Sequence, residues 1–122
     1  MAELRFKKLE VWKISKDLAV RIYKLTENFP ANEQYGISSQ LQRAAVSVPS
    51  NIAEGSGRGT KKDFIHFLNQ ARGSLYEIIT QLELSKSLGY GDNGSIESLE
   101  LEYQILAKRL NSFISSLKEV SD

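Results

Sequence analysis

Apolar residues recur along the chain at spacings of three and four, the pattern of amphipathic α-helices. Within residues 38–59 one such line consists of Leu41, Ala45, Val48 and Ile52. It is widened into a broad arc by Ala44, Val46, Pro49 and Ala53. So broad an arc indicates a helix that is covered on two sides. We expect this helix to continue through Pro49, with a bend there, and to stop at the glycines Gly55, Gly57 and Gly59.

Three further segments have helical periodicity. Residues 9–28 predict a first helix, which ends before Pro30 because the residue preceding a proline avoids the helical region. A third helix begins after Thr60, its predicted cap with Asp63 three residues on, and closes near Leu88, where Gly89 can adopt the left-handed conformation. Its apolar line consists of Phe64, Leu68, Ala71, Leu75, Ile78 and Leu82.

The last segment shows the most regular heptad of the chain. After the turn at residues 91–94, with Ser95 as the expected cap, its apolar line consists of Leu99, Tyr103, Leu106, Leu110, Phe113, Leu117 and Val120. No strand pattern is found. The sequence therefore predicts an all-α protein: a single domain over residues 1–122, folded as an antiparallel up-down-up-down four-helix bundle.

A narrow polar stripe runs along the helix predicted over residues 38–59. Its members are Gln40, Arg43, Ser47, Asn51, Glu54 and Arg58. The Glu54 carboxylate can reach Arg58 at i+4, and it needs a basic partner such as Arg43, Arg58 or Arg72 if a neighbouring helix covers it. Two interpretations stay open: an ion-pair network within or between subunits, or a binding site at the mouth of an assembly.

Charge is unevenly distributed although the net charge is only +1. Residues 5–24 carry seven basic side chains against Glu10 and Asp17, whereas residues 77–102 carry six acidic ones against Lys86 alone. This split favours either a basic surface for a polyanion or complementary faces that meet head-to-tail in a ring. The candidate phosphate contacts are Lys13, Lys16, Arg21, Lys24, Arg58, Lys61 and Lys62. A solvated face is the competing interpretation.

Catalytic chemistry finds little support. The chain has no cysteine and one histidine, His66, so neither a thiol nucleophile nor a histidine-rich metal site can form within one chain. The segment GSGRGTKK lacks the spacing of a phosphate-binding loop. We expect no enzymatic activity, cofactor or metal. No apolar run approaches a membrane span, and the start of the chain lacks a signal-peptide pattern, so we expect a cytoplasmic protein.

Several words of the sequence resemble one known family. They are Phe29-Pro30, Glu33, Tyr35-Gly36, Gln40, RAAVSVPSNIAEG from Arg43 to Gly55, Gly57-Arg58, and the later F-x-x-FL and ARGSL-x-E. These words are similar to the four helix bundle family, also called the 23S rRNA intervening-sequence proteins. The resemblance runs from Leu9 to about Leu88.

The resemblance implies assembly and a link to RNA. Members of this family are expected to be homo-oligomers with pentameric rings, and their fold is similar to that of an accessory protein of a reverse transcriptase. The expected function is therefore a non-enzymatic oligomer that binds RNA, DNA or a nucleic-acid enzyme such as a reverse transcriptase. The alternative is a purely structural protein–protein assembly module.

Overall fold

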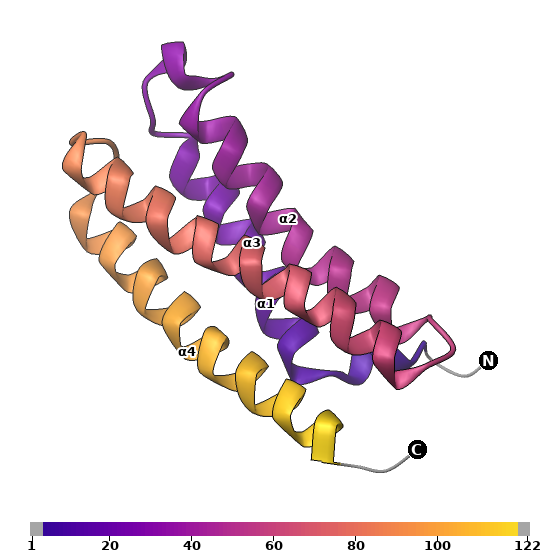
Figure 1. The fold of residues 1–122 in the computed structure, drawn as a ribbon. Coiled ribbons are helices and arrows are strands. Elements are labelled where there is room, and N and C mark those ends of the chain that lie inside the picture. Colours follow the sequence, from indigo (N-terminus) through magenta and orange to yellow (C-terminus); the bar gives the residue numbers. More distant parts are fainter. Residues whose placement is uncertain (1–3, 120–122) are drawn as a thin grey trace.

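The computed structural model describes residues 4–119 and shows four long helices (Figure 1). They are α1 (Glu10–Thr26), α2 (Ile37–Ser56), α3 (Lys61–Ser87) and α4 (Asn93–Glu119). Two short 3₁₀ helices, η1 (Arg5–Lys8) and η2 (Ala31–Glu33), flank α1. No strand occurs among the described residues. The prediction of an all-helical protein is confirmed.

The four helices lie side by side along a common long axis (Figure 1). Each helix packs against the next one in the chain, and α4 packs against α1. Within residues 4–119, α1 makes no close backbone contact with α3, and α2 makes none with α4. The helices therefore occupy four corners, so that α1 and α2 lie on the side opposite α3 and α4.

One apolar core joins all four helices. The predicted line of α2 is fully buried, and the predicted line of α3 is buried at every position. On α1 the polar residue Ser15 is also buried, and its hydroxyl donates a hydrogen bond to the carbonyl oxygen of Trp12 at 3.0 Å. On α4 the predicted residues Phe113 and Leu117 are only half-buried, and Val120 lies outside the described residues. Each fully buried leucine or isoleucine contributes about 1.5–3 kcal/mol.

Helix α2 continues without interruption through Pro49, as expected. The residues facing the core on either side of it, Val48 and Ile52, are fully buried. Packing on both flanks offsets the hydrogen bond that the proline removes. A bend at this position stays a prediction.

The interpretation of Gly55 as a chain break is wrong, because α2 includes Gly55 and ends at Ser56. Gly55 is buried against the start of α3. A β-carbon at this position would lie 2.7 Å from Cβ of Phe67 and 3.0 Å from a ring carbon of Phe64. The glycine therefore permits close approach of α2 and α3 rather than a turn.

The ends of α3 follow the sequence prediction. The Thr60 hydroxyl accepts a hydrogen bond from the Asp63 amide at 3.1 Å. At the other end Gly89 has φ +77°, and its amide donates to the carbonyl of Lys86 at 3.0 Å. The next amide, that of Tyr90, donates to the carbonyl of Ser85 at 3.0 Å. These two bonds form a Schellman motif, which satisfies the last carbonyls of α3.

The prediction of Ser95 as the cap of α4 is wrong. The helix begins at Asn93, and the preceding Asp92 carboxylate accepts hydrogen bonds from both the amide and the hydroxyl of Ser95, at 2.8 and 2.9 Å. Both hydrogen bonds from Ser95 lower the pKa of Asp92, and the bond from the backbone amide has the larger effect. Asp92 is therefore the residue that caps α4.

We expect Asp92→Ala to lower the melting temperature at pH 7 by roughly 2–5 °C, because the amide of Ser95 loses its acceptor. The depressed pKa means that this stabilisation is present above the unfolded-state pKa and is lost as the pH falls through the folded-state pKa. Thermal unfolding from pH 7 to pH 2 measures it. A difference between the variant and the wild type that persists unchanged at pH 2 would contradict a role for the carboxylate.

Candidate nucleic-acid interface

The four basic residues predicted on α1 do not share one environment. Lys13, Lys16 and Lys24 are exposed on the outer side of the helix, and Lys16 lies 3.9 Å from the Asp17 carboxylate. Arg21 is half-buried and forms an ion pair with Glu102 of α4. Its guanidinium charge is already matched, so Arg21 fastens α1 to α4 and is less available for a phosphate than the three lysines.

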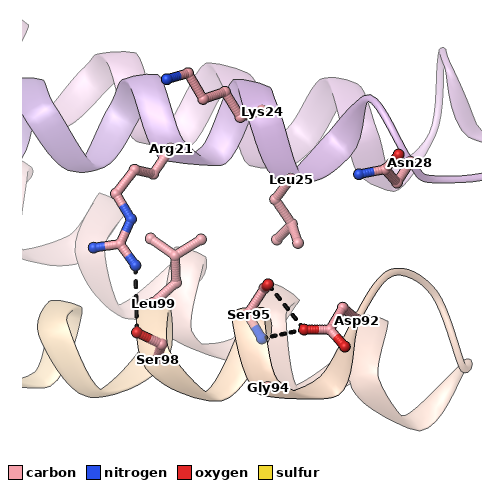
Figure 2. Close-up of a pocket in the computed structure, with 9 residues that line it drawn as sticks. All are labelled: Arg21, Lys24, Leu25, Asn28, Asp92, Gly94, Ser95, Ser98 and Leu99. Carbon is pink, nitrogen blue, oxygen red and sulfur yellow. Dashed lines mark hydrogen bonds between the residues drawn. The ribbon is translucent and has the colours of Figure 1, made fainter.

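A groove of about 470 Å³ lies between the end of α1 and the start of α4 (Figure 2). In Figure 2 the Arg21 side chain points across it to Ser98, to whose hydroxyl it donates at 3.3 Å, while Lys24 extends along α1 away from α4. The Asp92 carboxylate lies on the α4 side of the groove. Because Asp92 and the Glu102 that pairs with Arg21 supply negative charge here, this groove does not concentrate positive charge.

The connection between α2 and α3 carries Arg58, Lys61 and Lys62. Arg58 donates to the Glu54 carboxylate at 2.7 Å, as its spacing predicts, and its guanidinium lies 4.8 Å from the ring centroid of Phe67. Lys62 is exposed and Lys61 is half-buried. Both partners of the Arg58–Glu54 pair are about half exposed, so the pair stabilises the protein weakly and leaves Arg58 accessible.

Packing brings further basic residues to this end of the bundle. The Arg5 guanidinium lies 5.8 Å from the ring centroid of Phe64, at the start of α3. Phe64 meets Phe113 of α4 edge-on, with ring centroids 5.7 Å apart. A second groove, of about 450 Å³, lies between the start of α1 and residues 108–113 of α4, and Lys8 lines it. It is also lined by Lys108 and Arg109.

We call this region the basic end. It consists of Arg5, Lys7, Lys8, Arg58, Lys61, Lys62, Lys108 and Arg109. The described carboxylates at the same end, those of Glu10, Glu54, Asp63 and Glu119, are fewer. Positive charge therefore gathers from η1, the α2–α3 connection and α4, which are far apart in the sequence, and Lys13 lies one turn into α1 from the same end.

Sequence reasoning missed Lys108 and Arg109 as members of a site. They stand in a helix whose apolar heptad dominates the pattern, and only contact with the start of α1 places them beside other basic residues. The sequence signal that could have identified them is their position outside the apolar heptad line of α4, where two adjacent basic residues are expected to face solvent.

The polar stripe of α2 lies partly against α3. The hydroxyls of Ser47 and Ser74 are 2.8 Å apart, and the Asn51 amide donates to the carbonyl and the hydroxyl of Ser47, both at 2.9 Å. Arg43 donates to the Ser39 hydroxyl at 3.1 Å. Gln40, Arg43 and Ser47 line a groove of about 420 Å³, together with Ser74, Glu77 and Gln81 of α3. The stripe is thus a helix-packing seam at its centre and an open polar groove toward the start of α2.

Arg72 does not join this stripe. Its guanidinium donates to the amide oxygen of Asn111 on α4 at 2.9 Å. Arg72 was one of three candidate partners of Glu54, and it lies instead on the side of α3 that faces α4. Glu54 pairs with Arg58 instead.

Carboxylates gather at the opposite end of the molecule, between α3 and α4. The Lys86 amino group lies 3.1 Å from Glu83 and 3.9 Å from Glu97. Burial raises the pKa of Glu100, and its hydrogen bond with Glu83 raises it further, while the same bond lowers the pKa of Glu83. As the pH rises, Glu83 therefore loses its proton before Glu100 does. The molecule has a basic end and an acidic end.

The fold and this charge distribution describe a small helical protein whose basic side chains gather toward one end. The sequence profile of the 23S rRNA-intervening sequence protein family matches residues 7–112. The chain belongs to this family.

A solved structure is also similar to this chain. A protein of unknown function from the S23 ribosomal protein family, from Bacteroides thetaiotaomicron VPI-5482, is 31% identical to this chain, with a TM-score of 0.76. The match covers 85% of this chain and 97% of that one. No curated protein matches the chain. Over the described part of the chain, no helix has the length and apolar content needed to cross a membrane.

Proposed function

We propose that this protein is a non-enzymatic, cytoplasmic homo-oligomer that binds RNA through its basic end, by sequence-independent contacts with phosphates. The observation that carries the proposal is the convergence of basic side chains from η1, the α2–α3 connection and α4 on one end. Affinity for a polyanion grows with the number of phosphates neutralised together, so repetition of this end around an oligomer strengthens binding. A ring of five copies is the expected form.

The arrangement of the four helices as an up-down-up-down bundle is part of this proposal. The end of α1 contacts the start of α2, where the Gln42 amide donates to the Thr26 hydroxyl at 3.0 Å. The start of α3 contacts η1 and the end of α4 through Phe64. Such a bundle holds all contributors to the basic end on one scaffold.

The family supports RNA as the polyanion. Its description names the intervening sequence of 23S rRNA, and the solved neighbour carries the name of a ribosomal protein family while its function is unknown. DNA, or a nucleic-acid enzyme such as a reverse transcriptase, is an alternative partner with the same requirement for a basic surface. The experiment below separates RNA from DNA.

Fluorescence anisotropy of labelled structured RNA, single-stranded RNA and duplex DNA, across a salt series, tests the proposal on protein of known mass. We expect affinity that falls steeply with salt, and the slope counts the phosphates engaged. The double variant Lys62→Gln and Lys108→Gln is expected to weaken binding about tenfold at low salt and to flatten the slope.

A matched control removes the same net charge at the other end of the molecule. Asn32→Asp with Gln34→Glu, both at exposed positions in or beside η2, is expected to leave the affinity nearly unchanged. Equal losses in both double variants would show that only net charge matters and that the basic end is not a site. No binding of any nucleic acid at low salt would overturn the proposal.

The structural assembly module is the second candidate, favoured by apolar side chains that the single chain leaves exposed. Tyr76, Leu101 and Ile105 are examples, each about half exposed. If the protein is an oligomer but binds no nucleic acid, this candidate stands in place of the first.

A further inference from the structure

The groove between the start of α1 and residues 108–113 of α4 has an apolar wall. Leu9 and Phe113 line it, and both are half-buried, so each keeps part of its surface in contact with water. Phe113 also meets Phe64 of α3 edge-on, and this contact fixes the position of its ring. The groove therefore offers a partly aromatic surface that the packing of the bundle holds in place.

Cations border this apolar wall. Lys8, Lys108 and Arg109 line the groove and are exposed, and none of them forms an ion pair or a side-chain hydrogen bond with another of residues 4–119. Glu10 supplies the carboxylate in the lining. Glu119 lies at the end of α4, about 15 Å along the helix axis beyond Arg109. The side chains that line the groove thus carry an excess of positive charge that no carboxylate pairs with.

Two other grooves of the molecule differ in this respect. In the groove beside the end of α1, Arg21 is paired with Glu102, and Asp92 adds negative charge. The groove along the polar stripe of α2 is lined by both Arg43 and Glu77, among other polar side chains. An apolar wall next to unpaired cations distinguishes the groove at the basic end from these two.

An unpaired nucleotide has the chemistry that this groove would recognise. Its base presents a flat apolar face, and the phosphates on either side of it carry negative charge. In an RNA duplex the bases are stacked inside the helix, whereas in a loop, a bulge or a single strand they can be splayed out and stacked on an aromatic side chain. The groove, at about 450 Å³, lies within the range of about 300–1,000 Å³ that is typical of small-ligand sites.

A fatty acid fits the groove less well. Its acyl chain could lie on the apolar wall, but its single carboxylate would leave most of the cations without a partner. The basic end also continues beyond the groove to Arg5 and Lys62. A nucleic-acid strand repeats its charge along its length and can use these residues as well.

We propose that this groove holds one unpaired nucleotide of an RNA strand, with the base against Phe113 and Leu9. The phosphates on either side of the base pair with Lys8, Lys108 and Arg109. This inference rests on the proposed function and specifies the class of RNA, namely strands with unpaired bases. Because stacking on an aromatic ring tolerates every base, the binding stays independent of sequence.

Two duplex RNAs that differ in a single base test the inference. Each contains one bulged nucleotide, which is an adenosine in one RNA and an abasic ribose in the other, so both carry the same number of phosphates. Fluorescence anisotropy measures their affinity for the wild-type protein. We expect the adenosine bulge to bind about tenfold more tightly, as the stacking of one base would give. Equal affinities would overturn the inference, because binding then depends on the phosphates alone.

A pair of phenylalanine variants locates the base. Phe113→Leu keeps an apolar side chain but removes the ring, and it is expected to reduce the preference for the adenosine bulge to about twofold. Phe67 provides the control, since it is half-buried at the same end, beneath Arg58, but does not line the groove. Phe67→Leu is expected to keep the tenfold preference. A preference that survives in Phe113→Leu, or that both variants lose alike, would contradict the placement of the base.

A second variant in the groove keeps the test valid if Phe113→Leu unfolds the chain. Ser112 lines the groove at an exposed position of α4, so Ser112→Leu fills the groove without changing the charge or the core. We expect it to abolish the preference for the adenosine bulge while the affinity for the abasic bulge stays nearly the same. Circular dichroism checks the helix content of each variant. A folded Ser112→Leu protein that keeps the tenfold preference would overturn the inference.

The same measurements separate this inference from the proposed function. No binding of either RNA at low salt overturns the proposed function, and the inference with it. Salt-dependent binding of both RNAs with equal affinity overturns the nucleotide in the groove and leaves the proposed function standing. Equal affinities together with displacement of both RNAs by dodecanoate would assign the groove to an acyl chain instead.

Discussion

Replacing Gly55 by alanine is expected to lower the free energy of unfolding by about 1–2 kcal/mol, although alanine is the better helix former. The added methyl group would lie 2.7 Å from Cβ of Phe67 and 3.3 Å from the backbone oxygen of Phe64. Neither atom is the free end of a flexible side chain. Relief therefore requires α2 and α3 to separate, and the loss of packing outweighs the gain of about 1 kcal/mol in helix propensity.

Gly73 provides the matched control for this prediction. It lies inside α3, and a β-carbon there would meet no atom within 4 Å. Gly73→Ala is expected to gain about 0.5–1 kcal/mol from helix propensity alone. Urea unfolding followed by circular dichroism compares the free energies of unfolding of the two variants, which should differ by about 1.5–3 kcal/mol. If both glycine variants are stabilised alike, close packing at Gly55 does not limit the approach of α2 and α3.

Gly55 also shows where sequence reasoning reaches its limit. A glycine near two others after a helical pattern favours a break, because glycine lowers helix propensity. The residues that reverse this interpretation, Phe64 and Phe67, stand on the next helix, and their approach becomes visible only when the helices are packed. The apolar lines of α2 and α3 needed no such information, since periodicity alone identifies a buried face.

Local motifs were predictable where one residue type fits one geometry. Thr60 with Asp63, and Gly89 after the last turn of α3, adopt the expected bonds and angle. At the start of α4 the predicted cap was Ser95, and residue preference alone does not identify the residue that caps a helix. The structure does, because Asp92 accepts both bonds from Ser95.

The candidate site was predictable only in part. Clusters that are local in sequence, such as Lys61 with Lys62, could be identified from their charge. Partners across the bundle could not: Arg21 pairs with Glu102, and Arg72 bonds Asn111. For both arginines the sequence contains several acidic or polar residues that could serve as partners, and it does not show which of them lies close in the folded chain. Charge asymmetry along the chain did anticipate that the molecule has a basic and an acidic part.

The second large effect is expected at Tyr103, where removal of the hydroxyl oxygen is expected to stabilise the protein. Its side chain is fully buried in α4, and the hydroxyl oxygen has no hydrogen-bond partner among residues 4–119. A buried hydroxyl without a partner costs about 1–3 kcal/mol relative to its hydrated state. Tyr103→Phe keeps the ring and removes this cost, so the free energy of unfolding is expected to rise by about 1–2 kcal/mol.

Spectroscopic titration gives an independent measure of the same feature. Burial raises the pKa of Tyr103, with the positive charge of Arg21 as a smaller opposing influence. The pKa of Tyr90 is also raised, chiefly by the hydrogen bond that its hydroxyl donates to Glu33 at 2.7 Å. Ionisation of the native protein with increasing pH should therefore leave Tyr103 protonated until unfolding begins, and Tyr103→Phe should remove one tyrosine from that late transition.

The two measurements must agree for the interpretation to hold. An increase in stability together with the loss of one late-titrating tyrosine identifies the unpaired hydroxyl as the cause. If Tyr103→Phe lowers stability instead, the hydroxyl donates a hydrogen bond whose free energy outweighs the cost of its burial, and Arg21 cannot be the acceptor because a guanidinium only donates. An internal water would then accept the hydrogen bond from the Tyr103 hydroxyl, and Tyr103 would help to hold α4 in place against α1.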